Sequence, residues 1–335
     1  DLVFLLKRFY KSIVVTGTNG KSTTCKIIEH VLKKNKYKIS LGGNIGIPIL
    51  NLKIKKNSIL LIEASSFQLA YSKFIKPDFA ILLNITNDHL DWHGNMKHYV
   101  DSKFKIFTLQ KKNQYSFLNY KLKANYQKRN LSGKLITPKF ADYKIIKPKI
   151  RNIYLSSDIN DENMSFVFEL SRVLKISQNA FVKSLNNFVG LPHRYEIFLK
   201  RKNCLFINDS KATSFQSTKF ALKNSKNIFW ILGGMPKKND KIILRGLKKN
   251  ILRSYIIGKN TNFFKKQIKG QIKFYETRTI RKSILKILKD IRTLKKQNNT
   301  ILLSPSSASY DQYLNFEKRG EEFKRLSKNY ARKFT

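Results

Sequence analysis

The sequence has few cysteines, few acidic residues and no long uninterrupted apolar run. Its two cysteines, Cys25 and Cys204, are too few and too scattered for a disulfide framework or a zinc site. No apolar run reaches the length of a membrane span, and the first residues lack the basic leader and small-residue cleavage site of a secretory signal. We therefore expect a protein of the reducing cytoplasm, with neither a membrane segment nor a secretory signal.

Acidic residues are scarce relative to basic ones. The chain holds 67 lysines and arginines against 21 aspartates and glutamates, a formal net charge of +46 at pH 7. Such a charge is typical of nucleic-acid-binding proteins, but the lysines are spread along the whole chain and no aromatic–basic module that stacks on bases is present. Lysine, asparagine and isoleucine are abundant together, as A/T-rich codons produce. We expect no nucleic-acid partner, and the charge favours anionic substrates by long-range attraction.

The length of 335 residues predicts about two domains. Continuous apolar runs alternate with helical patterns, which predicts parallel sheets covered on both faces. The predicted strands are 13–15, 59–62, 79–85, 204–207, 228–232, 254–257 and 300–303. The predicted helices are 24–34, 97–109, 163–174, 215–222, 281–291 and 312–326. Residues 111–151 are poorly periodic and read as irregular strands and loops. Gly190 and Pro192 mark a linker within 187–193, so we divide the chain near residue 190.

A glycine turn joins the first predicted strand to the first predicted helix. Its sequence is Gly17-Thr18-Asn19-Gly20-Lys21-Ser22-Thr23. Backbone N–H groups of such a turn face an anion, Lys21 can reach outer phosphates, and Ser22 or Thr23 can hold Mg²⁺. A standard P-loop has a glycine five residues before Gly20, where this chain has Val15. The alternative is an ordinary turn, but the flanking strand and helix favour a nucleotide phosphate site.

Polar clusters follow two further strands of the first half. Ligands bind at the carboxyl ends of strands in open α/β sheets, so Glu63 is well placed for Mg²⁺; alternatively, Ser65 or Ser66 simply caps a short helix here. The second cluster gathers Asp88, His89, Asp91 and His93 within a single loop. His89 can ligate a hard metal together with carboxylate and phosphate oxygens, and the alternative is a structural histidine.

The second half has two more candidate segments. Arg194 and Lys211, in GLPHRYE and NDSKAT, are cations suited to a γ-phosphate or an acyl phosphate. Asp209 follows a predicted strand. Without further support this signal is weak, because surface cations are common in this chain. The serine-rich turn after Leu303 suits a carboxylate ligand, and its alternative is a well-capped helix.

Together these segments resemble the Mur ligase family, from about residue 1 to 330. The motifs that carry the resemblance are TGTNGKST, GGNIG, EASSFQL, LNITNDHLDWHG, GLPHRYE, NDSKAT and SPSSASYDQYLNFEKRGEEF. The last two resemble most the branch that adds D-glutamate, and no DNPR-type motif of the diaminopimelate-adding branch is present. The resemblance implies an α/β fold: a central P-loop ATPase domain with a mostly parallel sheet over residues 1–190, then a Rossmann-like, amino-acid-binding C-terminal domain over 191–335.

The resemblance also implies the reaction. Members of this branch form an amide between UDP-N-acetylmuramoyl-L-alanine and D-glutamate, through an acyl phosphate, in peptidoglycan synthesis. The implied cofactors are ATP and Mg²⁺, and we expect a cytoplasmic monomer. Two alternatives stay open. One is another ligase of the family, similar to folylpolyglutamate synthase. The other is a non-catalytic or nucleic-acid-binding remnant.

The family's functional positions map onto residues of this chain. Those that hold ATP phosphates are matched by Gly17, Thr18, Asn19, Gly20, Lys21, Ser22 and Thr23, and the other nucleotide contacts by Asn160, Asn163, Arg194 and Asp209. Those that bind Mg²⁺ are matched by Ser22, Glu63, His89 and Lys103, the last as a carbamate. Substrate positions are matched by Asn44, Ser65, His193, Lys211, Thr213, Lys237, Ser309 and Phe316. The implied catalytic set is Lys21, Glu63, His89, Lys103, Arg194 and Lys211.

The chain departs from the family pattern in several places. Residues 156–159 replace the usual Gly-Glu-His-Asn lead, Ser214 replaces an asparagine and Met235 replaces an aspartate. Val15, by contrast, is the form that this family uses. Residue 1 is not Met, and the chain begins after the domain that binds UDP in the family, so we expect a fragment or a processed piece.

Overall fold

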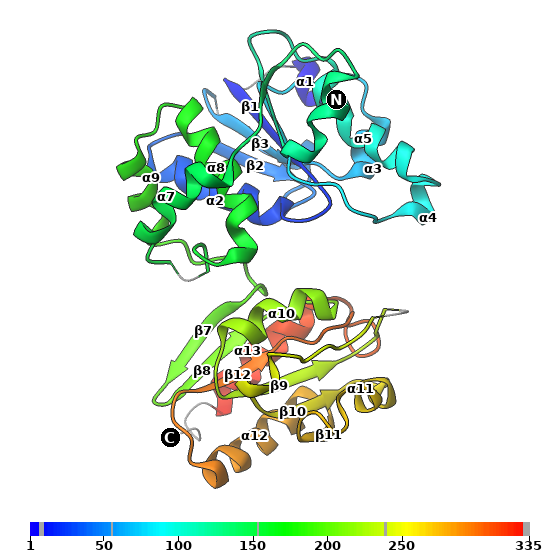
Figure 1. The fold of residues 1–335 in the computed structure, drawn as a ribbon, viewed down its shortest axis with the longest axis vertical. Coiled ribbons are helices and arrows are strands. Elements are labelled where there is room, and N and C mark those ends of the chain that lie inside the picture. The colour runs from blue at the N-terminus through cyan, green and yellow to red at the C-terminus, as the bar shows by residue number, and fades with distance from the viewer. Residues whose placement is uncertain (7–9, 55, 153, 238–239, 331–335) are drawn as a thin grey trace. The chain divides into compact units, whose positions relative to one another are not determined.

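The computed structural model describes residues 1–335 except 7–9, 55, 153, 238–239 and 331–335. The chain divides into two compact units, Asp1–Phe188 and Val189–Thr335 (Figure 1). Each unit contains one six-stranded sheet with helices packed on it, which confirms the predicted α/β class. Among the described residues, no helix is long and apolar enough to cross a membrane.

The sheet of the first unit is parallel throughout, in the order β2-β3-β1-β4-β5-β6. Its strands are β1 (Lys11–Thr16), β2 (Ile39–Gly43), β3 (Ile59–Glu63), β4 (Phe79–Leu82), β5 (Tyr115–Leu118) and β6 (Lys134–Ile136). Val15 pairs with Glu63, and Thr16 with Leu82. Because the strands are parallel and in this register, the segments that follow β1, β3 and β4 leave the sheet at the same edge.

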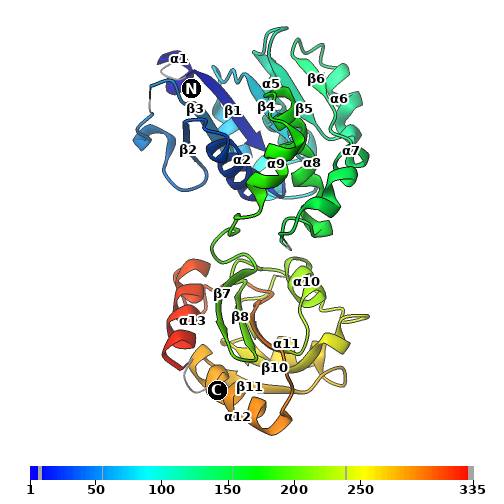
Figure 2. The same cartoon turned by 90° about the vertical axis from the view of Figure 1, so that its left-hand side faces the viewer.

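Helices cover both faces of this sheet. Figure 2 shows α2, α8 and α9 together on one face. Alternate strand residues such as Val14 and Leu60 pack on the opposite side with Phe104 and Phe107 of α5. The helices of the unit are α1 (Leu2–Leu6), α2 (Lys21–Lys34), α3 (Ser66–Tyr71), α4 (Leu90–His93), α5 (Met96–Thr108), α6 (Lys123–Gln127), α7 (Phe140–Ile146), α8 (Asp161–Val173) and α9 (Gln178–Leu185). Short 3₁₀ turns occupy Ile49–Asn51, Tyr120–Leu122, Lys147–Lys149 and Asp158–Asn160.

The sheet of the second unit has the order β11-β10-β9-β12-β8-β7, and only β7 runs antiparallel to its neighbour. Its strands are β7 (Glu196–Arg201), β8 (Cys204–Asn208), β9 (Ile228–Gly233), β10 (Ile251–Ile257), β11 (Phe274–Arg278) and β12 (Asn299–Leu303). Its helices are α10 (Phe215–Asn224), α11 (Thr261–Ile268), α12 (Ile280–Leu294) and α13 (Phe316–Tyr330), with a 3₁₀ turn at Lys248–Asn250. The apolar stripe of α12 and Phe323 of α13 pack on one core beneath the sheet.

The predicted strands and helices all exist, and several boundaries move for identifiable reasons. Helix α2 begins at Lys21 rather than at residue 24, because Gly20 is its N-cap. Helix α13 begins at Phe316 rather than at 312, because the Asn315 side chain accepts a hydrogen bond from Lys318 N at 2.9 Å and starts the helix there. Strand β4 ends at Leu82, three residues before the predicted end at 85.

The sequence reading missed elements that lack a long apolar run. Strands β2, β7 and β11 all lie at sheet edges, where one side needs no burial and the apolar pattern fades. The interpretation of residues 111–151 as strands and loops alone was wrong, because α6 and α7 also form there. Helix α7 is short and half of it is exposed, so its periodicity is weak.

Candidate active site

The glycine turn after β1 adopts a backbone that only glycine permits. Gly20 has φ of 84°, and a Cβ atom there would lie 2.2 Å from Asn163 Oδ1. Asn163, far along the sequence, therefore lies directly against the turn. Gly20, the N-cap of α2, has no side chain, so the N-cap position supplies no side-chain acceptor to the first turn of the helix. This turn has the form of an anion-binding site.

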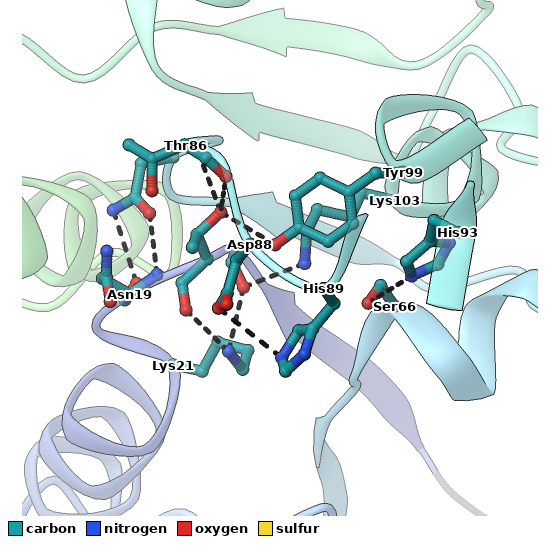
Figure 3. A network of polar contacts seen from close by, with 12 residues as sticks. Asn19, Lys21, Ser66, Thr86, Asp88, His89, His93, Tyr99 and Lys103 are labelled. Carbon is teal, nitrogen blue, oxygen red and sulfur yellow. Dashed lines mark hydrogen bonds and ion pairs between the residues drawn. The ribbon is translucent and has the colours of Figure 1, made fainter. Parts of the chain in front are cut away.

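Two lysines converge on this turn, as Figure 3 shows. Lys21 Nζ donates to the carbonyl oxygens of Gly17 and Thr18, each at 2.9 Å. Lys103 Nζ, from α5, donates to the same Gly17 oxygen at 3.0 Å. The structure thus brings together two cations that the sequence separates widely. Both ammonium groups therefore lie at the glycine turn.

The environment of Lys103 is unusual for a lysine. Its side chain is 1% exposed and lies over the ring of Tyr99, with Nζ 4.6 Å from the ring centroid. Burial, followed by repulsion from Lys21, lowers the pKa of Lys103 to about 7 against the attraction of Asp88. A substantial fraction of the neutral amine is therefore present near pH 7.

Thr18 belongs to the scaffold of the turn. Its hydroxyl lies 2.9 Å from the Tyr99 hydroxyl and accepts a hydrogen bond from Thr86 N at 3.0 Å. Its backbone N–H donates to Asn84 O at 2.9 Å. These bonds tie the turn to the loop after β4. Ser22 and Thr23 are buried in the first turn of α2.

Glu63, the last residue of β3, has one carboxylate oxygen with no hydrogen-bond donor among the described residues. The residue is 1% exposed, and its Oε1 accepts from Asn44 Nδ2 at 3.0 Å while Oε2 accepts none. A buried carboxylate oxygen without a donor is costly and fits a bound cation. This hydrogen bond places Asn44 beside Glu63.

The protein side chains at this edge suit a magnesium ion that is bound mainly by phosphate oxygens and water. Among the described residues, no group of three or more His, Cys, Asp or Glu side chains could hold a metal. Mg²⁺ is usually held by one or two carboxylates together with phosphate oxygens and water. The orphaned oxygen of Glu63, near a phosphate-binding turn, fits that pattern and does not fit a cage made of protein ligands alone.

The histidines of the loop after β4 have different surroundings. His89 has φ of 53°, a left-handed backbone that is strained for a non-glycine residue, and its side chain is 47% exposed. Its Nε2 lies 3.5 Å from Asp88 Oδ2 (Figure 3). His93 is buried, and its Nε2 lies 3.0 Å from Ser66 Oγ. His93 is therefore a structural histidine, whereas the side chain of His89 stays accessible to solvent and to ligands.

Ser65 caps the short helix α3, as one interpretation of that segment predicted. Its Oγ accepts from Gln68 N at 3.3 Å, and its own N–H donates to Gln68 Oε1 at 2.9 Å. This capping box places Ser65 at the carboxyl edge of the sheet, two residues after Glu63. A contact with substrate remains a proposal.

Asn160 and Asn163 lie together at the start of α8. Asn163 Nδ2 donates to Asn160 Oδ1 at 3.3 Å, and Asn160 Nδ2 donates to Tyr154 O at 2.7 Å. Asn160 thus holds the preceding loop, while Asn163 faces Gly20. The sequence reading missed Glu162, which lies between them; its only signal was its position inside the asparagine pair.

In the second unit, a tight turn carries His193 and Arg194. His193 has φ of 63°, and its N–H donates to Glu196 Oε2 at 2.9 Å. Asn208 Nδ2 bonds the same Glu196 oxygen at 3.0 Å and lies 2.9 Å from His193 Nδ1. Lys324 of α13 pairs with the other Glu196 oxygen. The half-buried Arg194 is therefore presented by a turn fixed from several elements.

Asp209, after β8, is a buried carboxylate inside this network. Its Oδ1 accepts from Tyr195 N at 3.0 Å and its Oδ2 from Ser304 Oγ at 2.7 Å. Burial raises the pKa of Asp209 to about 7, although these hydrogen bonds and the charge of Arg194 favour the carboxylate. Its hydrogen bonds join the turn before β7 to the loop after β12.

The positions assigned to the amino acid lie in the loops after β8, β9 and β12 and, for Phe316, at the start of α13. Lys211 Nζ lies 4.8 Å from the centroid of the Phe316 ring, and the His193 ring meets that ring edge-on at 5.9 Å. Ser309 is buried, and its carbonyl accepts from Gln312 N and Tyr313 N. The structure thus brings His193, Lys211 and Phe316 together. Thr213 is half-buried after β8, and Lys237 is exposed after β9.

Arg319 holds these loops in place, and the sequence reading missed it. It is 1% exposed in α13, and its guanidinium donates to Ser210 O, Ser307 O and Ala308 O at 2.8–3.2 Å. Its Nε donates to Ser210 Oγ at 3.0 Å. The signal that could have found it is a basic residue on the buried stripe of an amphipathic helix, beside Gly320, whose added Cβ would lie 2.1 Å from His193 Nδ1.

Comparison with known proteins adds relatives of the whole chain. Residues 15–184 match the family described as the Mur ligase middle domain. The UDP-N-acetylmuramoylalanine–D-glutamate ligase of Rickettsia felis is 33% identical over 355 residues, covering 100% of this chain and 79% of the relative. The protein of the same name from Buchnera aphidicola is 36% identical and covers 94% of this chain and 75% of the relative.

Solved structures share the fold at low identity. The MurF ligase of Thermotoga maritima, in complex with ADP, superposes with a TM-score of 0.66 at 19% identity, covering 97% of this chain and 82% of that one. The FolC protein of E. coli, in complex with ADP, gives a TM-score of 0.62 at 13% identity, covering 97% of this chain and 91% of that one. At such identities the likeness supports the fold alone.

Proposed function

The chain belongs to the Mur ligase family, and from that premise we propose that it joins D-glutamate to UDP-N-acetylmuramoyl-L-alanine at the expense of ATP. Relatives that share a third of its residues over nearly all of its length carry the name of this ligase. The product belongs to peptidoglycan synthesis, and we place the reaction in the cytoplasm. The motifs NDSKAT and SPSSASYDQYLNFEKRG agree with the D-glutamate branch.

The observation that carries the proposal is the convergence of charge at one sheet edge. Lys21 and Lys103 both donate to Gly17 O, and the buried Glu63 ends the neighbouring strand with one oxygen that has no donor in the part of the chain that the structure describes. A triphosphate would supply oxygens for the two ammonium groups, and Glu63 would help to hold a Mg²⁺ ion that neutralises phosphate charge. The turn therefore suits ATP as a phosphoryl donor.

In the first step, a carboxylate oxygen of the muramoyl-alanine attacks the γ-phosphorus, and the bond to the bridging oxygen of ADP breaks. Lys21 neutralises the charge on the transferring group, in a turn already organised to receive it. In the second step, the amine of D-glutamate attacks the acyl carbon, the carbon–oxygen bond to phosphate breaks, and the amine loses a proton. Phosphate and the amide are the products.

Magnesium, when bound, supplies Lewis-acid stabilisation of phosphate charge. We propose Glu63, Ser22 and His89 as its protein ligands, together with Lys103 as a carbamate. The neutral amine of Lys103, abundant because its pKa is about 7, can form a nitrogen–carbon bond to CO₂ and release a proton. The resulting anion would replace a buried cation by a magnesium ligand.

We propose that the second unit holds the amino acid and contributes to the nucleotide site. Lys211, Thr213, Lys237, Ser309 and Phe316 are assigned to D-glutamate or to the reaction intermediates. Arg194 and Asp209 are assigned to the nucleotide, as are Asn160 and Asn163 of the first unit. Asn44, Ser65 and His193 are assigned to substrate. The approach of Lys211, in the loop after β8, to Phe316, the first residue of α13, supports a shared role for these two residues.

A product assay over a panel of amino acids tests this function. The chain is incubated with ATP, Mg²⁺, UDP-N-acetylmuramoyl-L-alanine and one amino acid, and the amide product is detected by mass. We expect product with D-glutamate and none with L-glutamate, L-alanine or diaminopimelate. A second arm offers a folate acceptor with L-glutamate. Product in that arm alone, or no product in any arm, contradicts the proposal.

A further inference from the structure

Glu162, in the first turn of α8, accepts hydrogen bonds from two side-chain amides that lie far from it in sequence. Asn84 Nδ2, after β4, donates to Oε2 at 2.7 Å. Asn119 Nδ2, after β5, donates to Oε1 at 2.6 Å. The half-buried carboxylate therefore links the ends of two neighbouring strands to α8. No part of the proposed reaction uses this residue.

Asn84 in turn holds the backbone of the phosphate-binding turn. Its Oδ1 accepts from Asn19 N at 2.9 Å, and its Nδ2 donates to Asn19 O at 3.3 Å. The dashed lines at Asn19 in Figure 3 mark these two hydrogen bonds. The side-chain amide thus pairs with the Asn19 backbone much as a neighbouring strand would. Residue 19 is followed directly by Gly20 and Lys21, so its orientation sets the entry into α2.

The chemistry of a carboxylate decides how the Asn84 amide is oriented. An ionised carboxylate accepts hydrogen bonds and donates none. Glu162 therefore requires the Asn84 nitrogen on its side, which leaves the Asn84 oxygen for the Asn19 N–H. In the reversed orientation, the acceptor oxygen of Asn84 would face the acceptor oxygen of Glu162. Its donor nitrogen would face the donor N–H of Asn19, so neither hydrogen bond could form. Glu162 thus selects one of two nearly isosteric states of Asn84.

We propose that Glu162 is a positioning residue for ATP, acting through Asn84 to fix the Asn19 peptide of the phosphate-binding turn before the nucleotide arrives. The inference rests on the proposed function, because it assigns ATP to that turn. Both carboxylate oxygens already accept amide donors, so Glu162 is a poor candidate for a metal ligand. A preorganised turn loses less conformational freedom on binding and so binds more tightly.

The proposal predicts weaker nucleotide binding with little change in chemistry. Glu162→Ala should raise the KM for ATP and the Kd for Mg·ADP about tenfold, and leave kcat within about threefold. Glu162→Gln keeps the size but has one acceptor oxygen for two amide donors, so an intermediate loss is expected. Glu169→Ala is the matched control, because Glu169 lies on the same helix and pairs with Arg172.

A double-mutant cycle separates positioning from a general structural role. Mg·ADP affinity is measured by calorimetry for Glu162→Ala, Asn84→Ala and the double variant. If Glu162 acts through Asn84, the double variant binds no more weakly than Asn84→Ala alone. Losses that multiply, or a Glu162→Ala variant that binds like Glu169→Ala, overturn the proposal. Glu162→Gln serves for the cycle if the alanine variant does not fold.

A second readout needs no nucleotide. Hydrogen exchange at the Asn19 amide, followed by NMR on the unliganded chain, should accelerate about tenfold in Glu162→Ala and stay unchanged in Glu169→Ala. Unchanged exchange in Glu162→Ala contradicts the proposal. If the wild-type chain shows this change in exchange but binds no nucleotide, the proposed function is contradicted, and with it the role in ATP binding. If the wild-type chain binds Mg·ADP and Glu162→Ala binds it equally well, only the inference about Glu162 is contradicted.

Discussion

The carboxyl edges of the two sheets handle buried charge in opposite ways. In the first unit, Lys21 and Lys103 both donate to one carbonyl of the glycine turn, and the buried Glu63 keeps one oxygen without a donor among the described residues. In the second unit, Arg319 donates to four carbonyls and a hydroxyl, and the two oxygens of Asp209 accept two donors. The first edge is incomplete by itself, and the second is internally satisfied.

This difference separates residues that receive a ligand from residues that hold loops. A buried charge without full partners is costly and persists where a ligand completes it. A buried charge whose hydrogen bonds are all made fixes the segments that supply its partners. On this view the first edge suits the phosphate site that we propose, and at the second edge Arg319 belongs to a frame that holds Lys211 and Phe316.

The largest expected effect is at Lys21. Lys21→Ala should lower kcat/KM at least about 100-fold, because it removes a cation from the transferring phosphate. Phosphate release in a coupled assay measures it. Lys26→Ala is the control, since Lys26 lies on the same helix and pairs with Glu29 at the surface. Turnover near that of the wild type in Lys21→Ala would remove this lysine from the site.

Lys103 tests whether the first edge receives a modified residue. Lys103→Ala should lower activity about 100-fold, and acetate should restore part of it by standing in for the carbamate. Lys97→Ala, an exposed lysine of the same helix, should leave activity unchanged. Activity that survives the loss of Lys103 would show that the buried amine has no part in the reaction.

Arg319 tests the second edge as a frame. Arg319→Met should lower the free energy of unfolding by about 3 kcal/mol, because it leaves several buried carbonyls without donors. The KM for D-glutamate should rise with it, measured on the folded fraction. Arg325→Met, on the exposed side of the same helix, is the control. A stability equal to that of the control would mean that the loops do not depend on this cation.

The smallest expected effect concerns stability and pH. Because the folded-state pKa of Lys103 is lowered from 10.5 to about 7, the unfolded chain binds more protons between these values, and the destabilising effect of this lysine shrinks as pH rises through that range. Lys103→Met should therefore raise the free energy of unfolding by about 1–2 kcal/mol at pH 6, and by less at pH 9. Denaturant unfolding at both pH values measures this, and a gain that grows with pH would be the wrong sign.

Much of the first edge could be predicted from sequence, because its chemistry is local. The glycine turn and Lys21 occupy one short segment, Glu63 ends the apolar strand β3, and His89 lies in the segment after the apolar strand β4. The contact of Lys103 with Gly17 depends on the packing of α5, which residue spacing does not encode. Only the family resemblance indicated Lys103 as a site residue. The orphaned oxygen of Glu63 is a property of three-dimensional surroundings alone.

The supporting network of the second edge was largely invisible in the sequence. Arg319 is one basic residue among 67, and its burial follows from the face that α13 turns toward the sheet. Glu162 of the first unit gave only the signal of its position between Asn160 and Asn163, since its partners Asn84 and Asn119 come from other strand ends. Edge strands such as β7 were missed for a related reason, because half of their residues face solvent.

Amide hydrogen exchange of the full chain with and without Mg·ATP tests the central claim most directly. The account predicts slower exchange at residues 17–23 when nucleotide is present, because phosphate oxygens then accept from the backbone N–H groups of the turn. The same protection should be absent in Lys21→Ala and present in Lys26→Ala. Unchanged exchange at residues 17–23 with saturating nucleotide would contradict the assignment of this turn as the phosphate site.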